Sequence, residues 1–101
     1  MGEYSLFGKF TVKDGERDAL VEILLEATQS MKNVEECTHY HVHVSDDDPN
    51  AVYVYEVWKN ADAHQASLAL ESTQILIQRA KPIIAGIERI STLQPRGGKG
   101  L

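Results

Sequence analysis

Stretches of alternating apolar and polar residues are separated along this chain by stretches with helical spacing. Alternation is typical of half-buried strands, and apolar residues three or four positions apart are typical of an amphipathic helix. The pattern predicts, in order, a strand over 3–12, a helix over 19–31, strands over 37–45 and 51–58, helical residues from 60 onward that form one bent helix or two short ones, and a strand over 87–93. This β-α-β-β-α-β order is the split pattern of ferredoxin-like folds. We therefore expect an α+β fold with a four-stranded antiparallel sheet and helices on one face.

Turn and capping residues support these boundaries. Residues 46–50 combine three aspartates with proline and asparagine, which is typical of a solvated hairpin loop. Asn60 is the expected N-cap of the first helical piece after the third strand, and Ser72 or Thr73 is the candidate cap of a second piece. Gly86 is the expected left-handed terminator before the last strand.

The length of 101 residues fits one domain. We expect this ferredoxin-like domain to span residues 1–94 and a Gly-rich C-terminal tail to span 95–101. Helices on one face leave the other face of the sheet open, although Phe7 and aromatic residues of the third strand make the strands apolar. Gly8 interrupts the alternation and indicates a bulge or a close approach. We expect a homodimer whose sheets pack face to face, with a small-molecule pocket between sheet and helices in each subunit.

Charge and composition exclude several classes of protein. The formal net charge is -5 and there is no basic cluster outside the tail, which argues against a nucleic-acid partner. No apolar run approaches the roughly 20 residues of a membrane span, and the first residues lack the pattern of a signal peptide. The single cysteine, Cys37, cannot form an internal disulfide and fits a reducing compartment. We expect a cytoplasmic protein, and no nucleotide cofactor, because no Gly-rich phosphate loop is present.

The junction over residues 53–67, where a strand pattern gives way to a helix pattern, gathers the candidate site residues. Glu56 is either a general base whose pKa is raised by burial or a structural acid, and the structural role is favoured because no second acid or base is placed to pair with it. Trp58 either stacks on a flat substrate or plugs the core. His64 and Ser67 share a helical face, but no Asp is placed to orient His64, so a hydrolase triad is not expected.

Three histidines alternate along the second strand, at His39, His41 and His43. They are either metal ligands or a polar face that lines a dimer. Side chains at alternate strand positions stand about 6 to 7 Å apart, and convergence of all three on one ion would strain the strand. The polar face is therefore favoured, and we expect no metal site.

Tyrosines at positions 40, 53 and 55 offer flat side chains on the second and third strands. They could line a pocket for an aromatic ligand or pack across strands, and cross-strand packing is the favoured interpretation.

Several segments of the chain are similar to one known family. They are Val34-Glu35-Glu36-Cys37 followed by Tyr40, Asp48-Pro49, Tyr55 to Ala63 with its Glu-x-Trp-x-Asn-x-x-Ala pattern, Leu93-Gln94-Pro95 and Gly97-Gly98-Lys99-Gly100. Together they resemble the antibiotic biosynthesis monooxygenase (ABM) domain family over nearly the whole chain. The resemblance implies a ferredoxin-like fold assembled as a dimeric α+β barrel. Characterised members include cofactor-independent oxygenases of anthrones and quinols, haem-degrading oxygenases and an isomerase of a phosphorylated dione, so the shared frame does not fix one chemistry.

The chain departs from that family's pattern at three places. Glu36 stands where glycine usually precedes the cysteine, and Ser67 stands where a histidine usually ends the junction. His64, one helical turn earlier, is the candidate substitute for that proton acceptor. In haem-degrading relatives an asparagine and a tryptophan occupy the positions that match Gly8 and Ser67, so haem degradation is not expected.

The resemblance implies a cofactor-independent monooxygenase that binds a flat phenolic, quinol or polyketide-like molecule and favours its anion, which reacts with dioxygen. Glu56 and His64 are the expected catalytic residues, and Trp58, Ser67 and Tyr55 the expected substrate-binding residues. The alternative is a ligand-binding or regulatory dimer without turnover. No cofactor is expected in either case.

Overall fold

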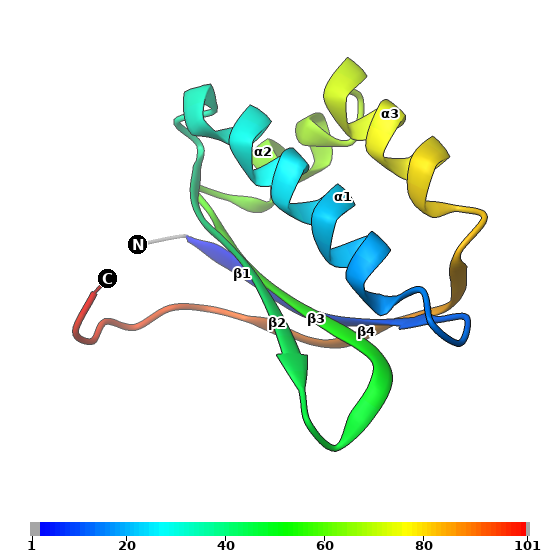
Figure 1. Ribbon diagram of the computed structural model, residues 1–101. Coiled ribbons are helices and arrows are strands. Elements are labelled where there is room, and N and C mark those ends of the chain that lie inside the picture. The colour runs from blue at the N-terminus through cyan, green and yellow to red at the C-terminus, as the bar shows by residue number, and fades with distance from the viewer. Residues whose placement is uncertain (1–2, 101) are drawn as a thin grey trace.

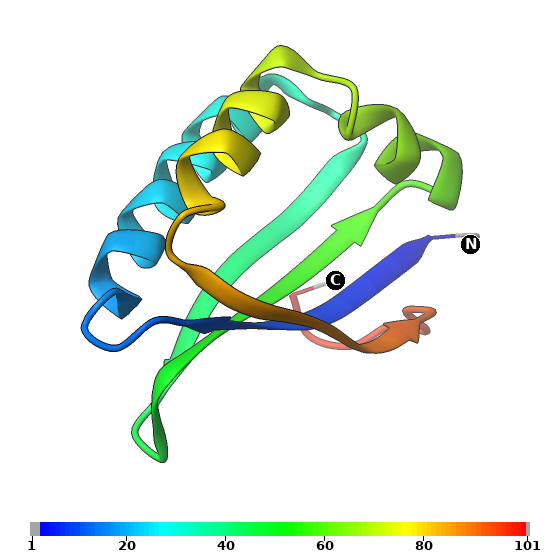
Figure 2. The same cartoon turned by 90° about the vertical axis from the view of Figure 1, so that its right-hand side faces the viewer.

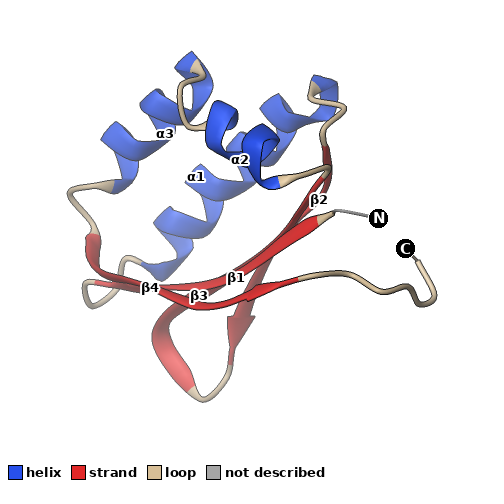
Figure 3. Cartoon of the chain, turned by 180° about the vertical axis from the view of Figure 1, so that it is seen from behind, coloured by secondary structure: helices blue, strands red, loops and turns tan. Residues whose placement is uncertain are grey.

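The computed structural model describes residues 3–100. Its elements are β1 (Tyr4–Val12), α1 (Arg17–Ser30), the short 3-10 turn η1 (Met31–Asn33), β2 (Cys37–Ser45), β3 (Asp48–Trp58), α2 (Ala61–Ser67), α3 (Glu71–Ala80) and β4 (Ile84–Leu93). The four strands form one antiparallel sheet in the order β2-β3-β1-β4. The helices lie on one face of it, as Figures 1 and 3 show. The expected ferredoxin-like α+β fold is therefore confirmed, with two short helices after β3 rather than one bent helix.

One face of the sheet packs against the helices and forms the core. On it, Val54 of β3 lies opposite Gly8 of β1 and Val42 of β2. The buried side chains of this core come from α1, α3 and two strands, β1 and β3: Val12, Leu20, Ile23, Leu24, Val52, Val54 and Ala80. In α1, Leu20 and Leu24 are one helical turn apart, so both reach the same side of the helix and meet the sheet.

No helix of residues 3–100 lies on the other face of the sheet (Figure 3), and this face carries aromatic side chains. Phe7 of β1 stacks on Tyr53 of β3 with ring centroids 6.0 Å apart. Tyr55 lies beside His41 of β2, at 6.2 Å between ring centroids. We call this the open face, and it consists of Phe7, Lys9, His39, His41, His43, Tyr53 and Tyr55.

The hairpin between β2 and β3 is tighter than the sequence predicts. β3 begins at Asp48 instead of 51, because Asp48 pairs with Ser45 across the turn. Arg17 donates to the backbone carbonyls of both residues, and Lys9 lies 3.5 Å from the Asp48 carboxylate. These partners hold Asp48 in the ladder, although the repulsion among the three aspartates favours a loop.

Two predicted boundaries around α3 were wrong. Its N-cap is Leu70, with no side-chain capping bond, so Ser72 and Thr73 are not caps. Gly86 is not a left-handed terminator: it lies inside β4 opposite Thr11, and its φ is not positive. The pairing with β1 extends β4 back to Ile84, which moves the strand start ahead of the predicted 87.

Two local predictions were correct. The Asn60 side chain accepts a hydrogen bond from the Ala63 N–H at 2.7 Å and so caps α2. A register shift between Phe7 and Gly8 against β4 is the bulge that the glycine indicated. In the described part of the chain, no helix combines the length and the apolar character needed to cross a membrane.

Candidate functional site

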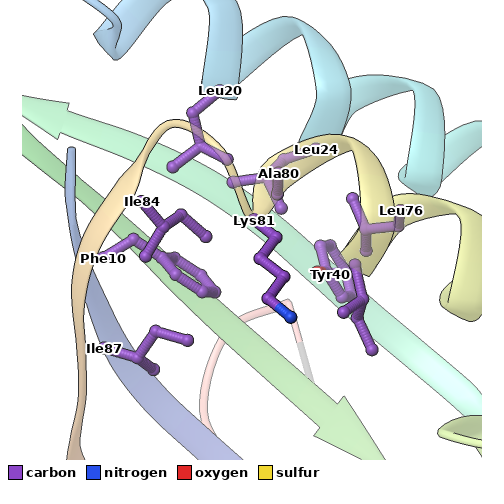
Figure 4. Close-up of a pocket in the computed structure, with 10 residues that line it drawn as sticks. Phe10, Leu20, Leu24, Tyr40, Leu76, Ala80, Lys81, Ile84 and Ile87 are labelled. Carbon is purple, nitrogen blue, oxygen red and sulfur yellow. The ribbon is translucent and has the colours of Figure 1, made fainter. Parts of the chain in front are cut away.

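A cavity of about 430 Å³ lies between the helices and the sheet (Figure 4). Its walls come from β1, α1, β2, α3 and β4, and the residues that line it are Phe10, Leu20, Leu24, Tyr40, Leu76, Ile77, Ala80, Lys81, Ile84 and Ile87. The volume falls in the range of about 300–1,000 Å³ that is typical of small-molecule sites. Ile87 is 72% exposed although it is a large apolar residue, which marks the open side of the cavity on β4. The lining suits an apolar ligand.

A smaller hollow of about 130 Å³ adjoins this cavity, and its lining includes the charged and titratable side chains of Lys9, Glu56, His64, Glu88 and Arg89. The two share Phe10 and Ile87 as lining residues. Gly8 forms part of the hollow's wall, on the helix-facing side of β1, where any larger residue would project a side chain into it. Glu56 and His64 line the same hollow, and Arg89 lies on β4 opposite Gly8. We call this the polar hollow.

The polar hollow is built around a contact between the end of β3 and the start of α2. Figure 2 shows α2 beside the carboxyl end of β3, away from the turn between β1 and α1. Trp58 Nε1 donates to Glu56 Oε1 at 3.0 Å, and the Trp58 ring meets the His64 ring edge-on with centroids 5.5 Å apart. The Tyr4 ring also lies beside the imidazole, with centroids 5.8 Å apart. Trp58 is 1% exposed and His64 9%, so the contact is nearly dry.

Burial shifts the two titratable groups of this contact toward their neutral forms. Desolvation raises the pKa of the Glu56 carboxyl, partly offset by its hydrogen bond from Trp58 and by the charge of Arg89. Desolvation, with the Arg89 charge as a smaller cause, lowers the pKa of His64. His64 Nε2 lies 4.0 Å from Glu56 Oε1, which is too long for a hydrogen bond. The distance argues against a direct hydrogen bond and both shifts act against an ion pair, so we interpret the two groups as polar side chains that face each other across a short gap.

The structure brings three of the five expected site residues together and separates two from them. Glu56, Trp58 and His64 meet as described. Tyr55 lies on the open face, because neighbouring residues of a strand point to opposite sides. The Ser67 hydroxyl donates to the His64 carbonyl at 2.6 Å, and Ser67 lines a separate hollow between α2 and the segment that joins η1 to β2.

The histidine row lies on the open face, away from the cavity. The rings of His39 and His41 are 5.4 Å apart and those of His41 and His43 are 6.0 Å apart, each pair edge-on. Within residues 3–100, no group of three or more His, Cys, Asp or Glu side chains is arranged to hold a metal ion. The geometry thus gives the metal-binding alternative no support.

Tyr40 is the tyrosine that lines the cavity. It lies on β2 opposite Glu56 and on the same side of the sheet. Burial, and next the nearby Glu56 charge, raise the pKa of its hydroxyl, which therefore stays protonated at neutral pH. Tyr40 thus packs against the core and lines the cavity, and its contact with an aromatic ligand stays a prediction.

Sequence reasoning missed three residues of this region: Arg89, Lys81 and Ile87. Arg89 reaches the polar hollow only because the bulge next to Gly8 sets the register between β1 and β4. The alternation of the last strand shows which of its residues share a face with Arg89, but it does not show which of the two faces lies on the same side of the sheet as Glu56. Lys81 follows α3 directly, where a lysine ordinarily indicates a favourable interaction with the helix dipole.

Comparisons with known proteins agree with this architecture. The sequence profile of the family described as antibiotic biosynthesis monooxygenase matches residues 4–76. A Chloroflexus aurantiacus J-10-fl protein classed with the antibiotic biosynthesis monooxygenases is 38% identical, with 97% of each chain covered and a TM-score of 0.84. Comparison with proteins of curated function finds no match.

More distant structures share the fold alone. A Nitrosomonas europaea protein of the same class is 14% identical, with 94% of this chain and 91% of that chain covered and a TM-score of 0.87. SnoaB, a cofactor-independent oxygenase from Streptomyces nogalater whose mutant structure is known, is 14% identical over 100% of both chains, with a TM-score of 0.82.

Proposed function

Because the chain belongs to the antibiotic biosynthesis monooxygenase family, we propose that it is a cofactor-independent monooxygenase of a flat phenolic, quinol or polyketide-like molecule. The observation that carries the proposal is the junction of an apolar cavity with a hollow in which Glu56 and His64 face each other, the pKa of the carboxyl raised and that of the imidazole lowered by burial. SnoaB, which has the same fold and is described as a cofactor-independent oxygenase, supports this kind of chemistry.

The proposed site binds the ring system in the cavity and its hydroxyl in the polar hollow. Two hydrogen bonds of about 2.8 Å that share one oxygen span roughly 4 to 4.6 Å. The 4.0 Å gap between His64 Nε2 and Glu56 Oε1 therefore fits a single ligand hydroxyl between them. Neutral imidazole can accept the hydroxyl proton, and the nearby positive charge of Arg89 stabilises the resulting anion.

The chemistry then needs only the substrate and dioxygen. The enol form of an anthrone-type substrate loses its hydroxyl proton to His64. The resulting anion is electron-rich at the ring carbon that carries the CH2 group in the keto form, and this carbon reduces dioxygen and forms a C–O bond. Cleavage of the O–O bond leaves a ring carbonyl and releases the second oxygen atom as water. The substrate supplies both electron pairs, so the protein's contribution is to bind, orient and deprotonate it, and to exclude bulk water around Trp58 and Tyr4.

We also propose that two copies pack through the open face. Phe7, Tyr53 and Tyr55 form an aromatic surface there, and no helix of residues 3–100 covers it. Such packing would bury the aromatic rows of both sheets between the copies and close a barrel-like core. The cavity lies on the other side of each sheet, so each subunit would keep its own site.

Oxygen uptake by metal-free protein tests the proposed reaction. A panel of anthrones and quinols should consume dioxygen faster with the protein than in its absence, and His64→Phe should remove most of the difference because it removes the proton acceptor. Gln65→Ala is the matched control, since Gln65 is an exposed residue of the same helix that lines neither the cavity nor the polar hollow. Rates equal to background across the panel would contradict the proposal.

One observation favours a second candidate, a ligand-binding dimer without turnover. Glu56 already accepts a hydrogen bond from Trp58, so its side chain stabilises the position of the Trp58 ring at the end of β3. A tightly bound aromatic molecule that is recovered unchanged after incubation in air would support this candidate.

A further inference from the structure

The lining of the cavity has an uneven charge pattern. Of the described residues that line it, nine are uncharged and one, Lys81, carries a charge. Figure 4 shows the Lys81 side chain between Phe10 on one side and Tyr40 on the other, with its nitrogen pointing into the space between them. A single cation among apolar walls forms a recognition point for an anionic group of a ligand that is otherwise apolar.

The fold places Lys81 here through its position at the end of α3. It is the residue that caps this helix, and Ala80 before it is buried in the core. None of the ion pairs found within residues 3–100 includes Lys81. Interaction with the helix dipole explains a positive charge at this position, but it does not require the side chain to lie along the cavity.

The second polar region is the polar hollow on the other side of Phe10 and Ile87, which both spaces share. A ligand in the cavity therefore meets a cation at Lys81 and the Glu56–His64 pair beyond the shared residues. These two contacts would fix which way round a flat ligand binds.

We propose that the cavity selects aromatic or polyketide-like carboxylates, whose carboxylate binds Lys81 while the reacting hydroxyl binds between Glu56 and His64. The proposal rests on the proposed function for the second contact and names its substrate class. The first contact depends only on binding. Lys81 is a binding residue in this account and takes no part in proton transfer.

A matched pair of ligands tests the contact without turnover. Anthracene-2-carboxylate and anthracene-2-carboxamide have nearly the same size and shape and differ in charge. Fluorescence titration of the intact protein at about pH 8 should give a dissociation constant about fivefold to tenfold lower for the carboxylate, as expected for one charge-assisted hydrogen bond.

Variants of Lys81 assign the preference to this residue. Lys81→Met keeps a long side chain without the charge and should bring the ratio of the two constants close to one, through weaker carboxylate binding. Lys81→Arg keeps the charge and should retain the preference. Lys32→Met, at an exposed lysine of η1 that does not line the cavity, should behave as the wild type.

Several results would overturn the inference: no binding of either ligand, equal affinity of the wild type for both, or equal weakening of both by Lys81→Met. A carboxylate preference that depends on Lys81, found without any oxygen uptake, would support this inference and contradict the proposed reaction. Oxygen uptake with neutral anthrones, found without a carboxylate preference, would support the proposed reaction and contradict this inference.

Discussion

The two sides of β3 differ in what they hold, although their residues alternate along one strand. Glu56 and Trp58 face the helices and belong to a buried polar contact beside an apolar cavity. Tyr53 and Tyr55 face the open side and belong to an aromatic surface with Phe7 and His41. One strand therefore separates a candidate site for small molecules from a candidate surface for a second copy. Substitutions on the two sides should affect different measurements.

The largest expected effect is on stability, at the helix-facing side. Trp58→Ala removes a fully buried ring and the donor to Glu56, so the free energy of unfolding should fall by about 3–5 kcal/mol. Ile75→Ala is the control, because this residue is 49% exposed on α3 and should cost less than about 1 kcal/mol. Urea unfolding followed by far-UV circular dichroism measures both. Similar losses for the two variants would contradict the assignment of Trp58 to the core.

The next effect is on assembly, at the open side. Tyr55→Glu places a charge within the aromatic surface and should weaken self-association by at least about a hundredfold, because a buried unpaired charge costs several kcal/mol. Gln29→Glu adds the same charge on the exposed side of α1 and should leave association unchanged. Sedimentation equilibrium provides the measurement. A wild type that stays monomeric at tens of micromolar would exclude the proposed dimer.

A pair of glycine substitutions compares the two sides directly. Gly8→Val puts a side chain on the helix-facing side, into the polar hollow, and should weaken ligand binding about tenfold. A Cβ at Gly8 would meet the Glu88 carbonyl at 3.5 Å, an ordinary contact, so the fold should tolerate the change. Gly86→Val is the control in β4: Gly86 does not line the cavity or the polar hollow, and a Cβ there would meet Thr11 at 3.9 Å.

Titration of both glycine variants with fluorescent anthracenes measures whether Gly8→Val weakens ligand binding more than Gly86→Val does. Equal affinities of the two variants would mean that ligands do not occupy the polar hollow. A loss confined to Gly86→Val would place the binding surface elsewhere.

The smallest expected effect is the pH dependence that Glu56 adds. Burial raises its pKa above the ordinary value of 4.5, so the folded protein holds this proton more tightly than the unfolded chain does. The stability that the neutral carboxyl contributes is therefore complete below about pH 4.5 and is lost as the pH rises through the folded-state pKa. Glu56→Gln keeps an acceptor for Trp58 and cannot ionise, so its stability should fall less than that of the wild type over this window.

Thermal melts at a series of pH values measure this difference, and Glu22→Gln, at an exposed position of α1, is the control. Parallel profiles for wild type and Glu56→Gln would contradict the buried carboxyl. His64 acts in a separate window: burial lowers its pKa, so the stability of the neutral imidazole is complete above pH 6.5 and is lost as the pH falls through the folded-state pKa.

The fold could be predicted from the sequence because its signals are local. Alternation and helical spacing fixed the order of elements, and the Asn60 cap and the Gly8 bulge were predicted with their physical reasons. The misplaced boundaries depend on partners that are distant in sequence. Gly86 belongs to a strand because it pairs with Thr11, and Asp48 belongs to a strand because Arg17 and Lys9 stabilise it there.

The candidate site could be predicted only where it is local. Glu56, Trp58 and His64 lie within nine residues of one another, so one junction revealed all three. Tyr55 was grouped with them although strand alternation places adjacent residues on opposite sides. Arg89 and Lys81 required the three-dimensional register of β4 and the end of α3, which no nearby residue indicates.

Labelling with ¹⁸O₂ tests the central claim most directly. Metal-free protein and an anthrone that bears a carboxylate, incubated under ¹⁸O₂, should give a ring carbonyl that contains one labelled oxygen atom, formed faster than without protein and much more slowly with His64→Phe. Product that carries oxygen only from water, or labelled product formed at the protein-free rate, would contradict the assignment of this cavity to oxygenation.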